Sequence, residues 1–235
     1  MKQLALDIGL AREPAFETFH GQGNEPALQA LQALGPGEPP VYLWGPTGCG
    51  KTHLLRALAT LAREQGRHCA WFDAGASGSW QLEREPDLLV LDQAEAWNPT
   101  QQHAAFSAFV RTVSVGGAVA SAGRLPPVDL PLREDIRTRL GWGHVVRVWP
   151  LGESELRRVL RDDALQRGLR LSEDVLDYLL RRVQRDLKSL TDLLERLDRY
   201  ALSLQRPLTV PLVRQMLEDE RQTEPSVPPP EWPNA

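Results

Sequence analysis

A phosphate-binding loop is the feature that most constrains this chain. Residues 45–52 read Gly-Pro-Thr-Gly-Cys-Gly-Lys-Thr, which is the complete pattern G-x-x-x-x-G-K-[ST]. The apolar run 41–44 precedes this loop, and residues 53–62 are apolar at helical spacing, so we expect the loop between a strand and a helix. There the backbone amides and the helix dipole favour a bound phosphate. A glycine turn without a ligand is the weaker alternative.

Side chains of this loop also have expected parts in a nucleotide site. Lys51 supplies a cation for the β- and γ-phosphates, and the Thr52 hydroxyl is placed to bind Mg²⁺. Three glycines let the backbone approach the phosphates: Gly45, Gly48 and Gly50. The pattern therefore predicts bound nucleotide with Mg²⁺.

A carboxylate at the end of a second apolar run is the expected partner of the loop. Asp92 follows residues 88–91 and is predicted to hold Mg²⁺ through water, with a strand-end cap as the alternative. The next residue is Gln93, where ATPases of this organisation usually carry a second acid. An amide cannot take a proton from water, so we expect weak turnover by this chain alone. Glu95 is an alternative acid, but two residues further on we expect it to point elsewhere.

Composition indicates a soluble globular protein of one large or two small domains. The chain has 235 residues, of which 42% are hydrophobic and 25% charged. It contains no run of 18 apolar residues and no signal peptide at the N-terminus, which predicts a cytoplasmic protein with no membrane partner. Cys49 and Cys69 are the only cysteines, so we expect reduced thiols rather than a disulfide framework.

The charge distribution argues against autonomous DNA binding. The net charge is −4, and basic and acidic side chains are equal in number over residues 151–221. Proteins that bind DNA on their own usually cluster Lys and Arg, which release counterions from the phosphate backbone. The sequence therefore favours a protein that binds other proteins.

Periodicity divides the chain into an α/β domain and a helical domain. Strands alternate with helices as far as residue 150, which predicts a parallel sheet. Residues 151–221 have helical period throughout, and residues 222–235, with five prolines, predict a disordered tail. The expected strands are 41–44, 68–73, 88–92, 117–122 and 145–148, and the expected helices outside the loop region are 27–34, 100–113, 153–167, 172–182, 187–204 and 210–220.

The arrangement as a whole resembles the AAA+ ATPases of the DnaA family, from about Gln3 to Leu217. The segments that carry the resemblance are 3–8, 16–19, 42–45, 51–55, 139–143 and 197–199. The resemblance implies an AAA+ P-loop core with a parallel sheet over residues 13–150, followed by a small all-α lid. DnaA itself continues into a helix-turn-helix domain after the lid. This chain has a proline-rich tail there instead, and its resemblance is strongest to the short homologues that regulate DnaA.

The resemblance also implies a clamp-binding peptide within residues 1–12. In the family this segment binds the sliding clamp, the beta subunit of DNA polymerase III. The residues that would fill the clamp pocket are Gln3, Leu4, Leu6 and Ile8. Asp7 stands where the family has proline, which is expected to weaken docking. A frayed terminus is the alternative reading of the six residues alone.

Further roles follow by resemblance. Arg139, in Thr-Arg-Leu-Gly-Trp-Gly, aligns with the family's arginine finger, whereas a lone surface arginine would be the ordinary interpretation. Lys188 stands where DnaA has a nucleotide-sensing arginine, and a lysine keeps the charge but not the bidentate fork. Gly123 stands where relatives carry an aspartate, so a polar sensor is lost. Phe16 and Phe19 resemble the mouth of the adenine pocket, with core packing as the alternative.

Together these features imply a negative regulator of replication initiation rather than an enzyme in its own right. Bound to ADP or ATP and to the DNA-loaded clamp, the protein would complete the active site of ATP-bound DnaA with Arg139, and would meet DNA only through the clamp. The alternatives are an independent AAA+ ATPase, a DnaA-like loader acting on DNA, and an adaptor with a vestigial nucleotide site. The sequence leaves a homodimer or larger oligomer open.

Overall fold

The computed structural model describes residues 14–19, 21–75, 80–182, 187–204 and 206–223. It divides into two compact units between Gly152 and Glu153, and each is described by itself. Among the described residues, no helix combines the length and apolar character needed to cross a bilayer. The clamp-peptide prediction, Gln3, Leu4, Leu6 and Ile8, lies outside the described residues.

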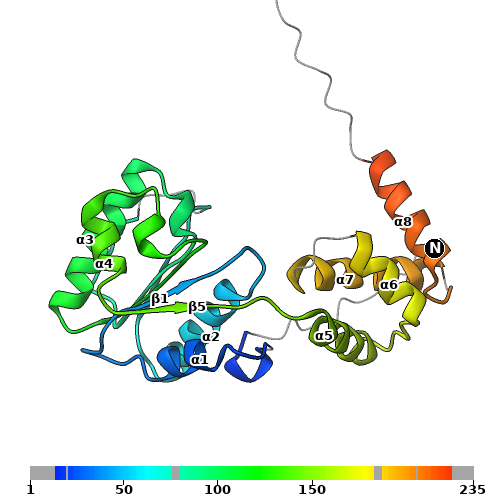
Figure 1. Ribbon diagram of the computed structural model, residues 1–235, viewed down its shortest axis with the longest axis horizontal. Coiled ribbons are helices and arrows are strands. Elements are labelled where there is room, and N and C mark those ends of the chain that lie inside the picture. Colours follow the sequence, from blue (N-terminus) through cyan, green and yellow to red (C-terminus); the bar gives the residue numbers. More distant parts are fainter. Residues whose placement is uncertain (1–13, 20, 76–79, 183–186, 205, 224–235) are drawn as a thin grey trace, which may run out of the picture. The chain divides into compact units, whose positions relative to one another are not determined.

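The first unit is built on a five-stranded sheet in the order β2-β3-β4-β1-β5 (Figure 1). Every pair of neighbouring strands is parallel, which confirms the predicted parallel sheet. The strands are β1 Val41–Trp44, β2 Cys69–Phe72, β3 Leu88–Leu91, β4 Ala118–Gly123 and β5 His144–Arg147. Because all strands run the same way, the residues that follow β1, β3 and β4 meet at one edge of the sheet, here called the carboxyl edge.

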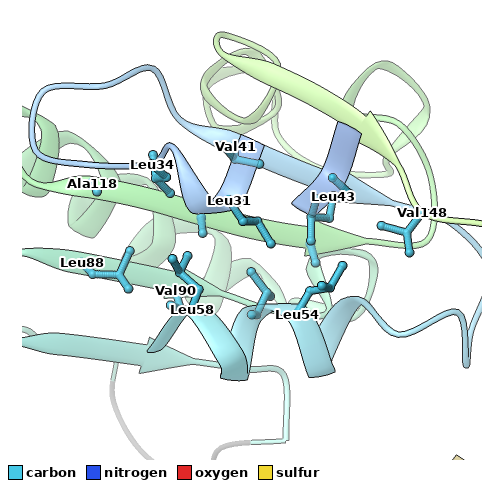
Figure 2. Close-up of a cluster of buried hydrophobic side chains, with 14 of the residues drawn as sticks. Leu31, Leu34, Val41, Leu43, Leu54, Leu58, Leu88, Val90, Ala118 and Val148 are labelled. Atoms are coloured by element: carbon cyan, nitrogen blue, oxygen red, sulfur yellow. The ribbon is translucent and has the colours of Figure 1, made fainter. Parts of the chain in front are cut away.

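Helices cover both faces of this sheet. They are α1 Glu25–Gln32, α2 Lys51–Glu64, α3 Pro99–Ser114 and α4 Glu134–Leu140, with 3₁₀ turns η1 Phe16–Thr18, η2 Ala94–Ala96 and η3 Pro127–Asp129. Successive side chains of β1 point to opposite faces of the sheet. Leu43 belongs to the hydrophobic cluster under α1 and α2, and Tyr42 belongs to the one under α3 and α4. Figure 2 shows the first cluster, in which Leu54 and Leu58 of α2 lie over the sheet.

Helix α4 was not among the expected elements. It has seven residues, and only Ile136 and Leu140 are buried. Two apolar positions one turn apart are too few for a periodic signal, so the sequence pattern gives no warning of this helix. The omission matters because Arg139 lies in its last turn.

The second unit contains four helices. They are α5 Glu153–Gln166, α6 Glu173–Arg182, α7 Leu187–Leu204 and α8 Val210–Thr223. All four helices were predicted from sequence, because each is a long amphipathic stretch. The bounds of α7 are the same as those predicted. Helix α8 reaches Thr223, two residues into the predicted tail, and residues 224–235 lie outside the described part of the chain.

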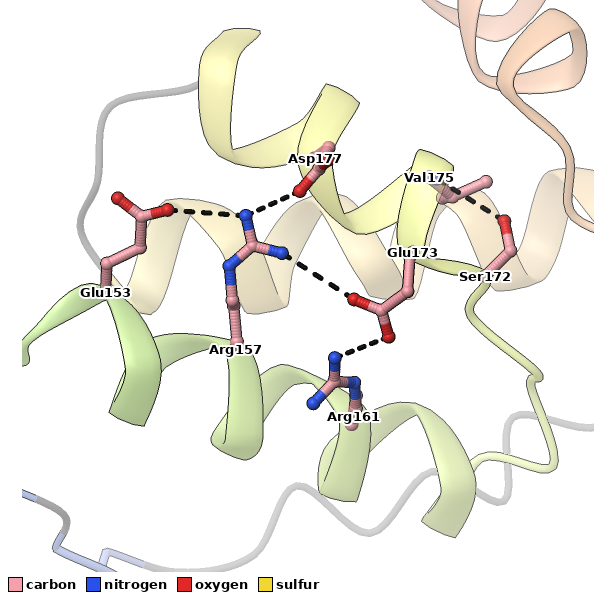
Figure 3. Close-up of polar contacts among 7 residues, drawn as sticks. All are labelled: Glu153, Arg157, Arg161, Ser172, Glu173, Val175 and Asp177. Carbon is pink, nitrogen blue, oxygen red and sulfur yellow. Dashed lines mark hydrogen bonds and ion pairs between the residues drawn. The ribbon is translucent and has the colours of Figure 1, made fainter.

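An arginine joins the first two helices of this unit (Figure 3). Arg157 of α5 contacts Glu153 at 3.3 Å, Asp177 of α6 at 2.5 Å and Glu173 at 3.7 Å. The hydrogen bond to Asp177 raises the pKa of Arg157 above its usual value. These partners are substantially exposed, so we expect the buried leucines of the four helices to stabilise the unit far more than this network does.

Candidate nucleotide site

The phosphate-binding loop joins β1 to α2, as the sequence predicted. Gly48 and Gly50 have φ values of 79° and 102°, a region that side-chain-bearing residues rarely adopt. Gly50 is also the residue that caps the N-terminus of α2. Glycine at these positions allows the loop to turn immediately before the positive end of the helix.

Lys51 is a buried cation held on neutral groups. Its Nζ donates to the carbonyl oxygens of Gly45 at 2.7 Å and Pro46 at 2.9 Å, and lies 3.7 Å from Cys49 Sγ. Among the described residues no carboxylate forms an ion pair with it. The Asp92 carboxylate is near enough to interact with this charge but does not contact it. A buried ammonium without a carboxylate in direct contact is unfavourable, so the loop suits an anionic ligand such as a phosphate.

Thr52 and Asp92 come together from distant parts of the sequence. The Thr52 hydroxyl donates to Asp92 Oδ2 at 2.6 Å, and the Gln93 amide donates to Asp92 Oδ1 at 2.8 Å. Burial raises the pKa of Asp92 above its ordinary value, and the Thr52 hydrogen bond opposes that rise. A hydroxyl and a carboxylate are hard oxygen ligands, so this pair fits Mg²⁺ bound together with phosphate oxygens.

At the position after Asp92, where a second acid is usual in ATPases of this organisation, the chain has the exposed amide of Gln93. Gln93 has a φ of 56°, and the chain turns there into η2. Glu95 points across to the neighbouring strand, where its Oε2 accepts from the Arg124 amide at 2.9 Å. Its charge is close enough to contribute to the raised pKa of Asp92. Both carboxylates thus lie at the carboxyl edge, but Glu95 is engaged at the end of β4.

The structure gives a reason for the absent sensor at Gly123. A Cβ built there would lie 2.1 Å from Tyr42 Oη and 3.3 Å from Glu95 Oε2. The Tyr42 side chain is fully buried, and its hydroxyl donates to the Leu125 carbonyl at 2.9 Å. The space that a sensor side chain would enter is therefore filled by Tyr42, a residue that sequence reasoning assigned only to a strand.

We expect Gly123→Ala to destabilise the first unit by roughly 2–4 kcal/mol, because the new methyl group must displace a buried hydroxyl from its acceptor. Urea unfolding followed by tryptophan fluorescence measures the change. The control is the same substitution in a Tyr42→Phe background, where the cost of adding the methyl group should fall. Equal costs in both backgrounds would show that Tyr42 is not the obstacle.

The residues before α1 pack on the nucleotide loop. Phe16 and Phe19 are half-buried against the core under α1 and α2, and the Phe19 ring lies against Gly50. His53 Nε2 is 3.2 Å from both the Ala15 carbonyl and Thr18 Oγ1. Both phenylalanines pack on the core, and Phe19 also lies beside the nucleotide loop, so their place at the mouth of an adenine pocket stays a prediction. Sequence reasoning missed His53, since a single histidine on a helix carries no sign of its partners.

Arg139 lies at the other edge of the sheet. Gly143 packs on the Pro40 carbonyl, and the His144 amide donates to that carbonyl at 2.8 Å, so the segment after α4 meets the chain just before β1 begins. The nucleotide loop starts after β1 ends. A strand of four residues spans about 13 Å, which separates the two ends. The structure therefore does not bring Arg139 to the Lys51, Thr52 and Asp92 group.

Lys188 lies in the first turn of α7, and its side chain falls outside the described part of the structure. Its predicted sensing of nucleotide stays a prediction. The same holds for the clamp contacts expected of residues 3–8.

Solved structures show the class to which this fold belongs. Domain III of the replication initiation protein DnaA from Thermotoga maritima is similar with a TM-score of 0.72 and 20% identity, over 88% of this chain and 97% of that one. AMPPCP-bound DnaA from Aquifex aeolicus has a TM-score of 0.67 and 21% identity over 91% and 71%. The RuvB branch migration motor of T. maritima has a TM-score of 0.64 and 16% identity over 88% and 72%. With its phosphate loop and helical lid, the chain has the α/β fold of AAA+ proteins.

Sequence comparisons specify the family. Residues 10–70 match the bacterial DnaA ATPase domain, and residues 153–217 match the lid domain of Hda. An uncharacterized protein of Haemophilus influenzae is 31% identical over 228 residues, which cover 92% of this chain and 98% of that protein. The chain belongs to the DnaA family of AAA+ proteins and has a lid of the Hda type, which links it to DNA replication.

Proposed function

We propose that this protein is a regulator of DnaA. It binds ADP or ATP in the loop 45–52, docks through residues 3–8 on the DNA-loaded sliding clamp, and supplies Arg139 to the active site of ATP-bound DnaA. DnaA then hydrolyses its ATP, and replication initiation stops. The net charge of −4 and the even mixture of basic and acidic side chains agree with contact to DNA only through the clamp.

The observation that carries this proposal is the separation of Arg139 from the protein's own nucleotide loop. An exposed arginine at the opposite edge of the sheet cannot serve its own loop, but it is available to a neighbour. A guanidinium placed beside a γ-phosphate spreads positive charge over the transition state of phosphoryl transfer. Arg139 is therefore suited to act on a nucleotide bound by another AAA+ domain.

The protein's own site favours holding a nucleotide over consuming one. Lys51 is buried and held towards the loop carbonyls, and Thr52 and Asp92 are joined in a pair that fits Mg²⁺. When bound, the metal would neutralise phosphate charge. Gln93 cannot accept a proton from water, and Tyr42 occupies the place of a sensor side chain at Gly123. The loop, Thr52 and Asp92 thus bind and orient the phosphates, while the groups that promote water attack are absent from positions 93 and 123.

Hydrolysis of DnaA-bound ATP, measured with clamp and DNA present, tests the proposal. The wild-type protein is expected to stimulate hydrolysis, and a variant lacking residues 1–8 is expected to lose that stimulation while it still binds ADP. A variant carrying Asp7→Pro is the matched control, since the family's proline should strengthen docking. Full stimulation by the truncated protein would refute the clamp step, and no stimulation by wild type would refute the regulatory function.

An independent ATPase is the second candidate, and the intact Thr52–Asp92 pair with Glu95 nearby favours it. Steady ATP hydrolysis without DnaA, lost in Glu95→Gln but kept in Gln93→Ala, would support this candidate over the regulatory one.

A further inference from the structure

A cavity of about 460 Å³ lies between helix α3 and residues 80–82. We call it the α3 groove. None of the described residues that line it belongs to the nucleotide loop. On α3 the lining extends from Thr100 to Arg111, a stretch of about 16 Å at the usual rise of an α-helix. A polyproline II segment rises about 3.1 Å per residue, so the groove is long enough for about five extended residues.

The floor of the groove is apolar and held in place by its neighbours. Its apolar lining residues are Trp80, Leu82, Ala104 and Ala108. The Trp80 ring is stacked on Phe72 with the ring centroids 5.2 Å apart, and it meets Trp97 edge-on at 5.6 Å. An aromatic ring that is already fixed loses little conformational entropy when a ligand packs on it.

The indole N–H of Trp80 lacks an acceptor. Trp80 is only 7% exposed, and its Nε1 forms no hydrogen bond with the described part of the chain. The neighbouring Trp97 differs, because its Nε1 donates to the Asp92 carbonyl at 2.8 Å. Burying a donor without an acceptor is unfavourable. An occupant that brings a carbonyl oxygen to Trp80 would therefore remove an unfavourable feature of the empty groove.

The polar lining carries donors and positive charge, and no carboxylate is among its described residues. His103 Nδ1 lies 3.3 Å from Arg133 Nη1. A guanidinium can only donate, so Nδ1 accepts and neutral His103 carries its hydrogen on Nε2. Arg111 pairs with Glu85 at 2.7 Å, but both side chains are nearly half exposed, and such a pair contributes little and can exchange for another carboxylate. The groove thus favours a ligand rich in carbonyl and carboxylate oxygens.

The chain's own residues 224–235 have the matching chemistry. They read Glu-Pro-Ser-Val-Pro-Pro-Pro-Glu-Trp-Pro-Asn-Ala, with five prolines, two glutamates and no lysine or arginine. A proline keeps its carbonyl acceptor but has no N–H, so this segment is rich in acceptors and poor in donors. The spacing P-x-x-P occurs at 225–228 and again at 230–233. Segments with this spacing are recognised by grooves that are lined with aromatic side chains.

We propose that the α3 groove binds residues 224–235 of this protein. The prolines pack on the Trp80 ring, a main-chain carbonyl of the segment accepts from Trp80 Nε1, and a glutamate of the segment pairs with Arg111. Bound in this way, the segment covers apolar lining that the empty groove leaves open. Its binding is independent of the proposed function, because the groove shares no described residue with the nucleotide loop and does not include Arg139.

The test follows the indole N–H signals of ¹⁵N-labelled full-length protein by NMR, with Trp80 and Trp232 assigned from their phenylalanine variants. Ending the chain after Thr223 is expected to shift the Trp80 signal. Ser107→Glu places a carboxylate in the groove, so it should move the Trp232 signal to its position in a free peptide of residues 224–235. Val110→Glu is the matched control, since Val110 is 37% exposed on the same helix and does not line the groove, and it should leave both signals in place.

A synthetic peptide of residues 223–235, titrated into the chain that ends after Thr223, measures the affinity. Ser107→Glu in the protein and Trp232→Ala in the peptide are each expected to raise the Kd about tenfold or more, the effect of losing an anchoring contact. Val110→Glu should leave the Kd unchanged. The melting temperature and ADP affinity of each protein variant show whether it is folded, and the peptide variant gives a result that no folding defect can affect.

Three results would overturn the proposal. They are a wild-type Trp232 signal at its free-peptide position, a Trp80 signal that does not respond to removal of residues 224–235, and peptide binding that survives Ser107→Glu. The last of these would place the segment elsewhere on the protein. Sedimentation then tells which copy supplies the segment: a mass that falls when residues 224–235 are removed supports docking on a second copy, and an unchanged mass supports docking within one chain.

Discussion

Replacing Arg139 with alanine is expected to lower the maximal stimulation of DnaA-bound ATP hydrolysis by roughly 10³-fold, the lower bound for loss of an arginine finger. The reason is electrostatic, since charge develops on the transferred phosphoryl oxygens and a planar guanidinium contacts two of them at once. Because Arg139 is exposed and lies at the edge of the sheet away from its own loop, the fold and ADP binding should be unaffected. Single-turnover hydrolysis at saturating protein measures the effect.

Two neighbouring substitutions make this measurement specific. Arg139→Lys keeps the charge but not the fork and is expected to restore only part of the rate. Arg137→Ala removes an arginine from the same turn of α4, and it should keep most of the stimulation. If Arg137→Ala and Arg139→Ala reduce the stimulation of hydrolysis equally, the loss comes from the positive charge of α4 as a whole and not from one arginine finger.

Replacing Lys51 with alanine is expected to weaken nucleotide binding by about 10²-fold or more, because a buried charged hydrogen bond to phosphate contributes roughly 1.5–3 kcal/mol and the ion–ion attraction adds to it. The wild-type ammonium donates to the Gly45 and Pro46 carbonyls, so it already lies within the loop that is expected to hold the phosphates. Equilibrium titration with a fluorescent ADP measures the affinity.

The control for Lys51 is Thr52→Ala. That variant loses the hydroxyl paired with Asp92, so it should lose the Mg²⁺ dependence of binding and keep much of the metal-free affinity. Wild-type affinity in Lys51→Ala would mean that the loop does not hold the phosphates. In that case the protein would act as an adaptor with a vestigial site.

Much of the fold follows from local pattern. The loop 45–52, its preceding strand and its following helix share one short segment, so their geometry depends on nearby residues alone. Helix α7 is long and strongly amphipathic, and its bounds match the prediction. Helix α4 has one buried turn and escaped detection, although it carries the residue most important to the proposed function.

Contacts between distant segments account for the rest of the site. Sequence alone read Gly123 as a missing sensor, whereas the close approach of the Tyr42 hydroxyl from the neighbouring strand shows that a side chain has no room there. The His53 contacts with Ala15 and Thr18 likewise depend on how η1 packs on α2. Such contacts depend on strand order and packing, which no short pattern encodes.

The sequence by itself determined that this chain has a phosphate-binding loop in a parallel α/β domain followed by a helical lid, because those features depend on residue spacing within single elements. Only the tertiary structure decided that the Thr52 hydroxyl donates directly to Asp92, that Tyr42 fills the space beside Gly123, and that the end of α4 lies at the edge of the sheet opposite the nucleotide loop. The order β2-β3-β4-β1-β5 is the physical cause, since it makes neighbours of strands that are far apart in the chain.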